Sequence, residues 1–352
     1  MTTSTTREPE PQQAAGAGEP DGAGAARGRD TTHAAFELLE RYGLLLFLAA
    51  VALFFSLLPA TSSLFPTSRN VDALLGNQTV VTIAALAAIL PLIPNHFDVS
   101  VGSVLGLSSI GTAAAMSRFH TGLAVAILVG ILIGCVVGAI NGALVAFAKL
   151  NAVIVTLAAT IIISGVVEWY TSGVAINTGI SSHLTDFGSL KWLGIPRPAW
   201  LLLAVCLVVW YLLEQTPLGR RLYMIGDNPQ ASHLIGVRVN RLTFLSFVLA
   251  GALAGIAGVV LCARTGGANP NDGPGYLFPE LVAAFLGTTA IRPGRFNVWG
   301  TLVAVFFVAV TVNGLSLSGA QPWVQPVFNG VALLVAVALA ALLARRRRQG
   351  RL

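Results

Sequence analysis

Few residues in this chain have the types and the spacing that catalysis or metal binding would need. The five histidines never share a helical face with carboxylates or cysteines, so the pattern predicts neither a metal site nor a proton relay. They are His33, His96, His120, His183 and His233. The three cysteines, Cys135, Cys206 and Cys262, lie inside apolar runs without metal-ligand spacing, so we expect buried small hydrophobic residues.

Nucleotide chemistry is also not predicted. The chain has two lysines, Lys149 and Lys191, and neither completes a Gly-x-x-x-x-Gly-Lys-Ser/Thr phosphate loop. We therefore expect no enzyme activity and no cofactor in this chain, and any ATP and Mg²⁺ would be bound by a partner subunit.

Polar residues inside apolar runs are the remaining candidates for chemistry. Asp98 lies between two apolar runs, just before Ser100 and Gly102. It could form a polar joint in a broken helix that lines a permeation path, because irregular backbone at membrane depth must face protein or a cavity. Alternatively, Asp98 and Ser100 could cap the helix that follows by accepting hydrogen bonds from its free amides. The two roles are compatible.

Composition places these residues in a membrane. Of the 352 residues, 55% are apolar and only 10% are charged, whereas soluble proteins have about 25% charged residues. Apolar runs of about 18 or more residues, each able to cross a hydrocarbon core as a helix, recur between Tyr42 and Ala344. The net charge is +6, but the basic residues flank apolar runs and are not interleaved with aromatic ones, so no nucleic-acid groove is predicted.

The sequence predicts an all-α, polytopic membrane protein with about ten spans. The spans are placed at 42–60, 74–93, 99–117, 122–148, 152–171, 199–214, 243–263, 277–291, 298–317 and 324–344. With both termini in the cytoplasm, most arginines fall on the cytoplasmic side, including Arg220, Arg221 and the run at 345–348. Residues 1–31, which are rich in Ala, Gly, Pro, Thr and Glu, are expected to form a disordered tail, 32–344 the transmembrane domain and 345–352 a basic tail.

Glycines spaced by four residues mark close helix packing. They are Gly130, Gly134, Gly138 and Gly142 in one span, and Gly251, Gly255 and Gly258 in another. Small residues at this spacing form a flat groove in which another backbone can approach closely in lipid. Packing within one bundle and helix dimerisation between protomers both fit the pattern.

The one large cytoplasmic element is the segment 215–242. We expect two short amphipathic helices, with turns at 226–229 and at Gly236. Ala231, Leu234, Ile235 and Val237 would give the second helix an apolar stripe. Because the chain has no phosphate loop, ATP energy would have to enter through such a surface. A membrane-surface helix, or a basic loop that only sets orientation, would show the same features.

Four stretches in order resemble a known family. They are HFDVSVGS at 96–103, AINGALVAFAKLNAVIVTLAAT at 139–160, TPLGRRLYMIGDNPQASHLIGVRVNR at 216–241 and WGTLVAVFFVAVTVNGLSLSGA at 299–320. Together they resemble the permease subunits of binding-protein-dependent ABC importers for ribose and related sugars, over residues 42–343. The chain departs from the family at His96 and Phe97, and at Leu277 and Pro279, where the family has an acidic pair.

The resemblance implies specific roles for residues and partners. It makes 215–242 the segment that couples to an ATP-binding subunit, through Gly219, Arg220, Arg221, Gly226, Asn228, Ala231, Leu234, Ile235 and Gly236. It places Asn141, Asn177, Thr178 and Asn313, with Asp98 and Ser100, along a sugar path, although interhelical hydrogen bonds would explain each amide equally well. It further implies an extracytoplasmic solute-binding protein, a second permease copy and a location in the cytoplasmic membrane.

Other functions remain open at this stage. A permease of the same superfamily for branched-chain amino acids or nucleosides is the nearest alternative, and FDVSVGS favours sugars over it. An ion-coupled secondary transporter usually has ionisable residues in mid-membrane, and few are evident here. A membrane anchor or scaffold would leave the 215–242 segment unexplained.

Overall fold

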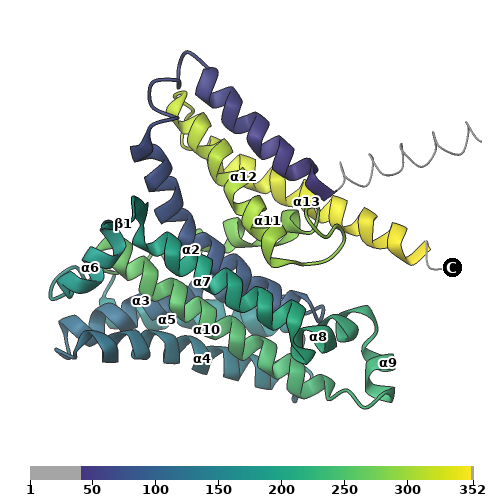
Figure 1. Ribbon diagram of the computed structural model, residues 1–352. Helices are drawn as coiled ribbons and strands as arrows, with labels where there is room; N and C mark the ends of the chain where they lie inside the picture. Colours follow the sequence, from purple (N-terminus) through teal and green to yellow (C-terminus); the bar gives the residue numbers. More distant parts are fainter. Residues whose placement is uncertain (1–40, 350–352) are drawn as a thin grey trace, which may run out of the picture. The chain divides into compact units, whose positions relative to one another are not determined.

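Helices make up almost all of the computed structural model, which describes the backbone of residues 41–349 and the side chains of residues 41–341. The predicted tail at 1–31 lies outside the described residues. The first described helix is Arg41–Leu57. The remaining elements, with the labels of Figure 1, are α2 (Ser68–Leu92), α3 (Val101–Ser117), α4 (Leu123–Ala146), α5 (Ala152–Thr171), α6 (Ser182–Ser189), β1 (Lys191–Trp192), β2 (Ile195–Pro196), α7 (Arg197–Trp210), the π-helix η1 (Tyr211–Gln215), α8 (Pro217–Asp227), α9 (Pro229–Leu234), α10 (Val239–Thr265), the 3₁₀ turn η2 (Gly273–Tyr276), α11 (Leu277–Gly287), α12 (Val298–Leu317) and α13 (Val324–Gln349).

Seven helices in the described part of the chain are long and apolar enough to cross a membrane. They are α2, α4, α5, α7 with its π-helical end, α10, α12 and α13. Arg41–Leu57 and α3 are shorter apolar helices. The structure is therefore that of an all-α, polytopic membrane protein.

Side chains fix where several of these helices begin. The Asn151 side chain accepts hydrogen bonds from the amides of Val153 and Ile154 at the start of α5. The Asn297 side chain accepts one from the Gly300 amide at 2.7 Å, at the start of α12. Such caps satisfy amides that have no partner within the helix.

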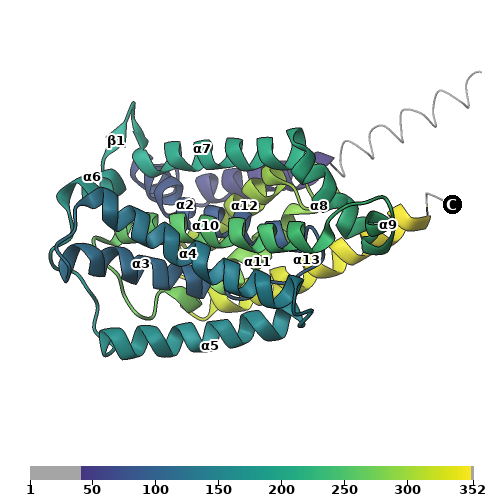
Figure 2. The same ribbon diagram turned by 90° about the horizontal axis from the view of Figure 1, so that it is seen from below.

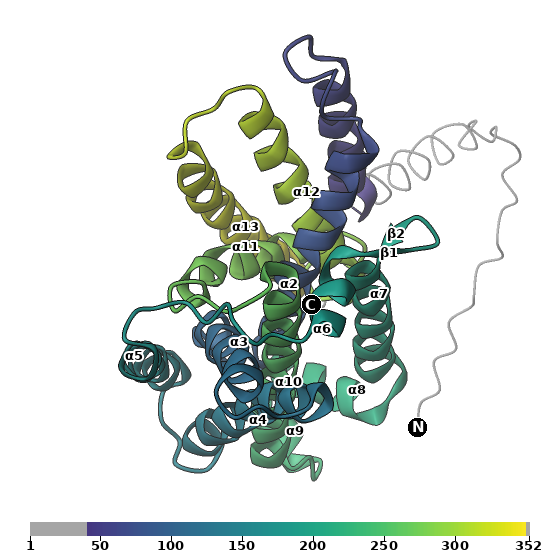
Figure 3. The same cartoon turned by 90° about the vertical axis from the view of Figure 1, so that its left-hand side faces the viewer.

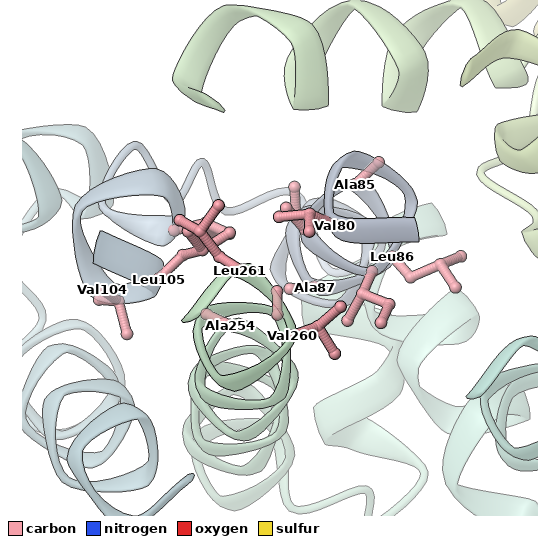
Figure 4. Packing of buried hydrophobic residues seen from close by; sticks show 14 of the residues in the cluster. Val80, Ala85, Leu86, Ala87, Val104, Leu105, Ala254, Val260 and Leu261 are labelled. Carbon is pink, nitrogen blue, oxygen red and sulfur yellow. The ribbon is translucent and has the colours of Figure 1, made fainter. Parts of the chain in front are cut away.

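The α10 helix lies at the centre of the packing, in contact with α2, α3 and α4 (Figure 3). Apolar residues of α2, α3 and α10 meet in a dense core (Figure 4). Val80 and Leu86 come from α2, Leu105 from α3, and Val260 and Leu261 from α10. The side chains labelled in this part of the core are all aliphatic.

Backbones touch where α4 crosses α10. A Cβ atom added to Gly134 would lie 2.1 Å from the carbonyl oxygen of Gly251, and one added to Gly138 would lie 2.4 Å from that of Phe247. Both distances are far inside van der Waals contact, so only glycine fits. The glycine spacing in the sequence therefore corresponds to packing within one chain.

The opposite face of α4 is apolar and exposed. Leu128, Leu132, Val136 and Ile140 recur every fourth residue and are each more than half exposed. Large aliphatic side chains in such a continuous row are typical of a surface that faces lipid or another membrane helix. In α5 and α13 most of the apolar window is likewise unburied, at 28% and 11% buried.

Two predicted boundaries differ from the structure in informative ways. The span predicted at 277–291 contains only the eleven-residue α11, which is about 16 Å long and too short to cross a hydrocarbon core about 30 Å thick. The α13 helix continues to Gln349, past the predicted span end at 344, so the predicted tail at 345–352 begins as helix. The remaining predicted spans each overlap one helix.

Candidate functional site

Two helices begin in the interior of the bundle, after irregular segments. Residues 93–100 connect α2 to α3, and residues 266–276 connect α10 to α11. The starts of α3 and α11 meet, because a Cβ atom on Gly102 would lie 2.8 Å from the Gly273 carbonyl oxygen and 3.1 Å from the Leu277 amide nitrogen. We call this meeting point the joint. Irregular backbone of this kind is tolerated at membrane depth only inside protein or beside a cavity.

A polar network built from Asp98, Ser100 and Asn141 lies at the joint. The Oδ1 atom of Asp98 accepts hydrogen bonds from the Ser100 amide at 2.9 Å and from the Ser100 hydroxyl at 2.6 Å. Asn141 on α4 donates to the Ser100 hydroxyl oxygen at 3.0 Å. All three residues are buried. The structure thus brings together three of the six residues expected along a path.

The alternative prediction, that Asp98 and Ser100 cap α3 by accepting hydrogen bonds from its free amides, is wrong. Ser100 is the residue before α3, but its side chain accepts no hydrogen bond from the helix amides. Asp98 binds Ser100 itself and not the first turn of α3. The backbone of Val99 forms its hydrogen bonds with α5. The Thr156 hydroxyl oxygen accepts from the Val99 amide, and the Thr160 hydroxyl donates to the Val99 carbonyl.

The other three candidates lie elsewhere. Asn177 and Thr178 are exposed in the segment between α5 and α6, beside the short bridge of Ile176 with Ala268. Asn313 on α12 exchanges two hydrogen bonds with Asn70 at the start of α2, at 3.0 and 3.1 Å. This amide pair joins two helices, which was the alternative role for such residues.

The sequence reasoning missed Glu280. This residue, in the first turn of α11, is fully buried at the joint. The sequence contained a signal for this residue, because Glu280 is the one acidic residue in the apolar stretch predicted as the span 277–291. The scarcity of ionisable residues in mid-membrane was the argument against an ion-coupled secondary transporter. The buried Glu280 weakens that argument.

At the other end of α10, α8 and α9 form the predicted pair of short helices (Figures 1 and 2). Two glycines let α8 lie directly on the bundle. A Cβ atom on Gly219 would lie 1.9 Å from the Leu213 carbonyl oxygen, and one on Gly226 would lie 2.1 Å from that of Ile93. Asn95 fixes the second contact by donating to the Gly226 carbonyl at 2.6 Å.

A set of polar contacts ties η1 and α8 to residues 288–297, which connect α11 to α12. Arg292 pairs with Glu214 at 2.9 Å, and Arg295 pairs with Asp227 at 3.5 Å. Tyr223 donates its hydroxyl to the Phe296 carbonyl at 2.7 Å. Burial raises the pKa of Tyr223 to about 12, so the hydroxyl keeps its proton and remains a donor at neutral pH.

The tip of this element is apolar and exposed. Leu234 at the end of α9 is 86% exposed, and Ile235 is 66% exposed. Gly236 follows with a φ of +83°, a conformation that favours glycine. Asn228 caps α9 by accepting from the Ala231 amide at 3.0 Å. The apolar stripe expected here thus points away from the protein.

A groove of about 550 Å³ runs beside this tip. Its lining combines apolar side chains with three arginines and consists of Arg221, Met224, Ile235, Gly236, Val237, Arg238, Arg241 and Leu242. Such a lining is suited to an acidic and apolar protein surface.

Long apolar helices, exposed aliphatic faces and a polar joint between broken helices define a multi-pass membrane protein. The family comparison specifies the class further. The chain belongs to the family described as "Branched-chain amino acid transport system / permease component", whose model matches residues 70–337.

Curated relatives agree with this membership. The chain is 33% identical over 303 residues to the ribose import permease protein RbsC of Escherichia coli (strain K12), covering 85% of this chain and 93% of the relative. It is 36% identical over 272 residues to RbsC of Bacillus subtilis (strain 168), covering 77% and 84%. It is 30% identical over 307 residues to the D-allose transport system permease protein AlsC of Escherichia coli (strain K12), covering 87% and 93%. The resemblance to ribose and simple-sugar permeases is confirmed. No solved structure matches the chain.

Proposed function

We propose that this chain is the permease subunit of an ATP-driven importer that moves a sugar or a related polyol across the cell membrane. Its relatives RbsC and AlsC are named for ribose and D-allose, and they cover most of its length. The observation that carries the proposal is the α8–α9 element, which presents an exposed apolar tip next to arginines in a chain without a phosphate loop.

In this proposal, the α8–α9 element docks on a separate ATP-binding subunit. Leu234 and Ile235 would enter an apolar groove of that partner, and Arg220 and Arg221 would pair with its acidic residues. The contacts of α8 with Arg295 and Phe296, and of η1 with Arg292, support transmission of movement from the docking surface to α11 and α12. ATP and Mg²⁺ would bind to the partner.

We infer that the chain crosses the membrane ten times, with both ends in the cytoplasm. Support comes from one end of the bundle, where the Ile291 amide binds the Arg41 carbonyl and where α8, Arg292 and Arg295 meet. This end holds most of the described arginines, which favours the cytoplasmic side. The α11 crossing would consist of a short helix and the irregular segment before it.

A second copy of the chain and an external solute-binding protein would complete the importer. Support for the second copy comes from the aliphatic faces of α4, α5 and α13, which the other described helices leave exposed. The solute would then pass between the copies. The segment at 172–196, with α6 and the β1–β2 hairpin, offers the surface for the solute-binding protein.

A neutral, hydroxylated solute fits the joint better than an amino acid. The groups that line its crevice include the Ser100 hydroxyl, the Asn141 amide and the Asp98 carboxyl, and no basic residue is among them. Hydroxyl, amide and carboxyl groups can exchange hydrogen bonds with sugar hydroxyls, whereas an amino acid carboxylate would call for a cation. The family description names branched-chain amino acids, so these remain the second candidate.

Uptake in a strain that lacks this gene tests the proposal. We expect loss of ATP-dependent uptake of a pentose, a hexose or a related polyol, with leucine and nucleoside uptake unchanged. Restoration by the intact gene is the control. Loss of branched-chain amino acid uptake, with every sugar still imported, would replace the sugar assignment with the second candidate.

A further inference from the structure

The joint holds two carboxyl groups that the proposed transport mechanism does not use. Asp98 ends the irregular segment before α3 and is 4% exposed, and Glu280 in the first turn of α11 is 0% exposed. Gly102 brings the two helix starts into contact, and Asp98 is the titratable residue whose charge acts on Glu280. The two side chains therefore form an electrostatic pair.

Their hydrogen bonding is unequal. Asp98 accepts from both the amide and the hydroxyl of Ser100. Neither carboxyl oxygen of Glu280 makes a well-formed hydrogen bond within the described part of the chain, and the one donor that acts on them is the Gly102 amide. An ionised carboxylate on Asp98 is therefore stabilised by donors more strongly than one on Glu280.

Among the described side chains, no cation pairs with Asp98 or Glu280. Among residues 41–341, the ion pairs are Lys191 with Asp72, Arg292 with Glu214 and Arg295 with Asp227. The irregular segments contribute His96, whose ring packs on Phe247, and the half-buried Asp272 and Tyr276 before α11.

The surrounding helices add no charge at this depth. The charged residues of α2 are Arg69 and Asp72 near its start, and those of α10 are Arg241 near its start and Arg264 near its end. Arg264 is bound to the Gly188 carbonyl and to the Asn77 side chain. The sequences of α3 and α12 contain no titratable residue, and α4 contains only Cys135.

Two ionised carboxylates in this place would be unstable. Burying one unpaired ion costs several kcal/mol in real proteins, and two adjacent carboxylates cannot both ionise readily. The starts of α3 and of α11 each contribute a positive end of about half an elementary charge. Together they can offset one negative charge, which leaves the second carboxyl without compensation.

We propose that Asp98 and Glu280 form a proton-binding site that holds one proton at neutral pH, carried by Glu280, while Asp98 keeps its negative charge. The proton replaces the missing cation. When it leaves for bulk water, two like charges face each other across the contact of Gly102 with Gly273. Their repulsion favours separation of α3 from α11, so the joint becomes sensitive to pH.

Infrared spectroscopy of the full chain in lipid nanodiscs tests where the proton is. We expect a carbonyl stretching band of a protonated carboxylic acid at neutral pH, which disappears on titration to alkaline pH. The band should shift when glutamate is labelled with ¹³C at the side-chain carboxyl, and should not shift with labelled aspartate. Glu280→Gln should remove it, and Asp272→Asn, which changes a half-buried acid outside the pair, should leave it in place.

Thermal unfolding over the same pH range gives a second measurement. A proton bound in the folded state and absent from the unfolded state at neutral pH makes stability fall as pH rises through its release. We expect this fall in the wild type and its loss in Glu280→Gln. If that variant does not fold, the infrared band of the isotope-labelled wild type still shows whether a glutamate carries the proton. A missing band, a band that follows aspartate, or an unchanged pH profile in a folded Glu280→Gln would overturn the proposal.

Discussion

Single glycines set how closely the helices of this protein approach. The contact of Gly134 with Gly251 leaves no room for a side chain, whereas Gly165 on α5 has no atom within 4 Å of an added Cβ. Both glycines lie inside helices, so an alanine substitution gains the same helix propensity at each, about 1 kcal/mol. Alanine variants at the two positions therefore separate the effect of helix packing from that of helix propensity.

We expect Gly134→Ala to destabilise the protein and Gly165→Ala to leave it unchanged or slightly more stable. A Cβ at 2.1 Å from a carbonyl oxygen forces α4 away from α10, and overpacking of this kind costs about 1–3 kcal/mol. Thermal unfolding of the two purified variants in the same detergent measures the difference. Equal melting temperatures would mean that α4 and α10 can separate without penalty.

The sequence predicted these glycine contacts better than it predicted the polar site. Spacing by four residues is visible in one chain segment, and it indicates which helix face must be flat. Asp98, whose charge acts on Glu280, and Asn70, the partner of Asn313, are distant from those residues in the sequence. No local pattern reports whether an amide joins two helices or faces a path.

At the scale of elements, η1 and α8 are held against residues 288–297 by two unequal ion pairs. Glu214 is 9% exposed and also accepts from the Trp210 indole at 2.8 Å, while Arg292 is 53% exposed. The Asp227 partner of Arg295 is 58% exposed. Glu214 lies in the π-helical turn at the end of α7, a geometry that often occurs at functional sites.

We expect Arg292→Gln to cost about 1–3 kcal/mol, because it leaves a buried carboxylate without its cation, and Arg295→Gln to cost less than about 1 kcal/mol. The double variant Glu214→Gln/Arg292→Gln should lose less than the sum of the two single variants. Thermal unfolding of Arg292→Gln, Arg295→Gln, Glu214→Gln and the double variant gives the four free-energy differences. Strict additivity would show that the Arg292–Glu214 contact contributes nothing.

The exposed tip of α9 makes a different prediction, which concerns the partner and not stability. Leu234→Asp should leave folding unchanged, because the side chain is 86% exposed. It should abolish solute-stimulated ATP hydrolysis in the assembled importer, since a charge would enter an apolar contact. Leu193→Asp, at an 80% exposed position in the β1–β2 turn, is the matched control. Normal ATPase stimulation by Leu234→Asp would argue against docking through α9.

Element boundaries followed from the sequence where an apolar run and a cap coincide, as at α5 and α12. They failed at α11, which begins inside the bundle and is short. The apolar stretch from Leu277 onward continues past Gly287, so hydropathy alone extends the helix, but the chain turns at 288–297 to meet α8. Only the tertiary contacts of that turn reveal the short helix.

At the scale of the whole molecule, the distribution of arginines predicts the orientation. Helix α8, which carries Arg220, and helix α6, which ends at Ser189, lie at opposite ends of the long helices (Figure 2), and both residues are exposed. The α6 end holds Arg69, Arg118, Lys191, Arg197 and Arg264, and the α8 end holds a larger group of basic residues. The positive-inside rule depends on this difference in number and not on any single residue.

We expect a cysteine at Arg220 to be protected from a membrane-impermeant thiol reagent in sealed cells, and a cysteine at Ser189 to react. The background should lack the native cysteines, of which Cys206 and Cys262 are buried and Cys135 is partly exposed. Permeabilised cells provide the control, because the Arg220 position must then react as its exposure requires. Ten crossings place α8 and Ser189 on opposite sides, since α7 alone separates them. Labelling at Arg220→Cys in sealed cells would reverse the orientation, and with it the access of α9 to a cytoplasmic ATP-binding subunit.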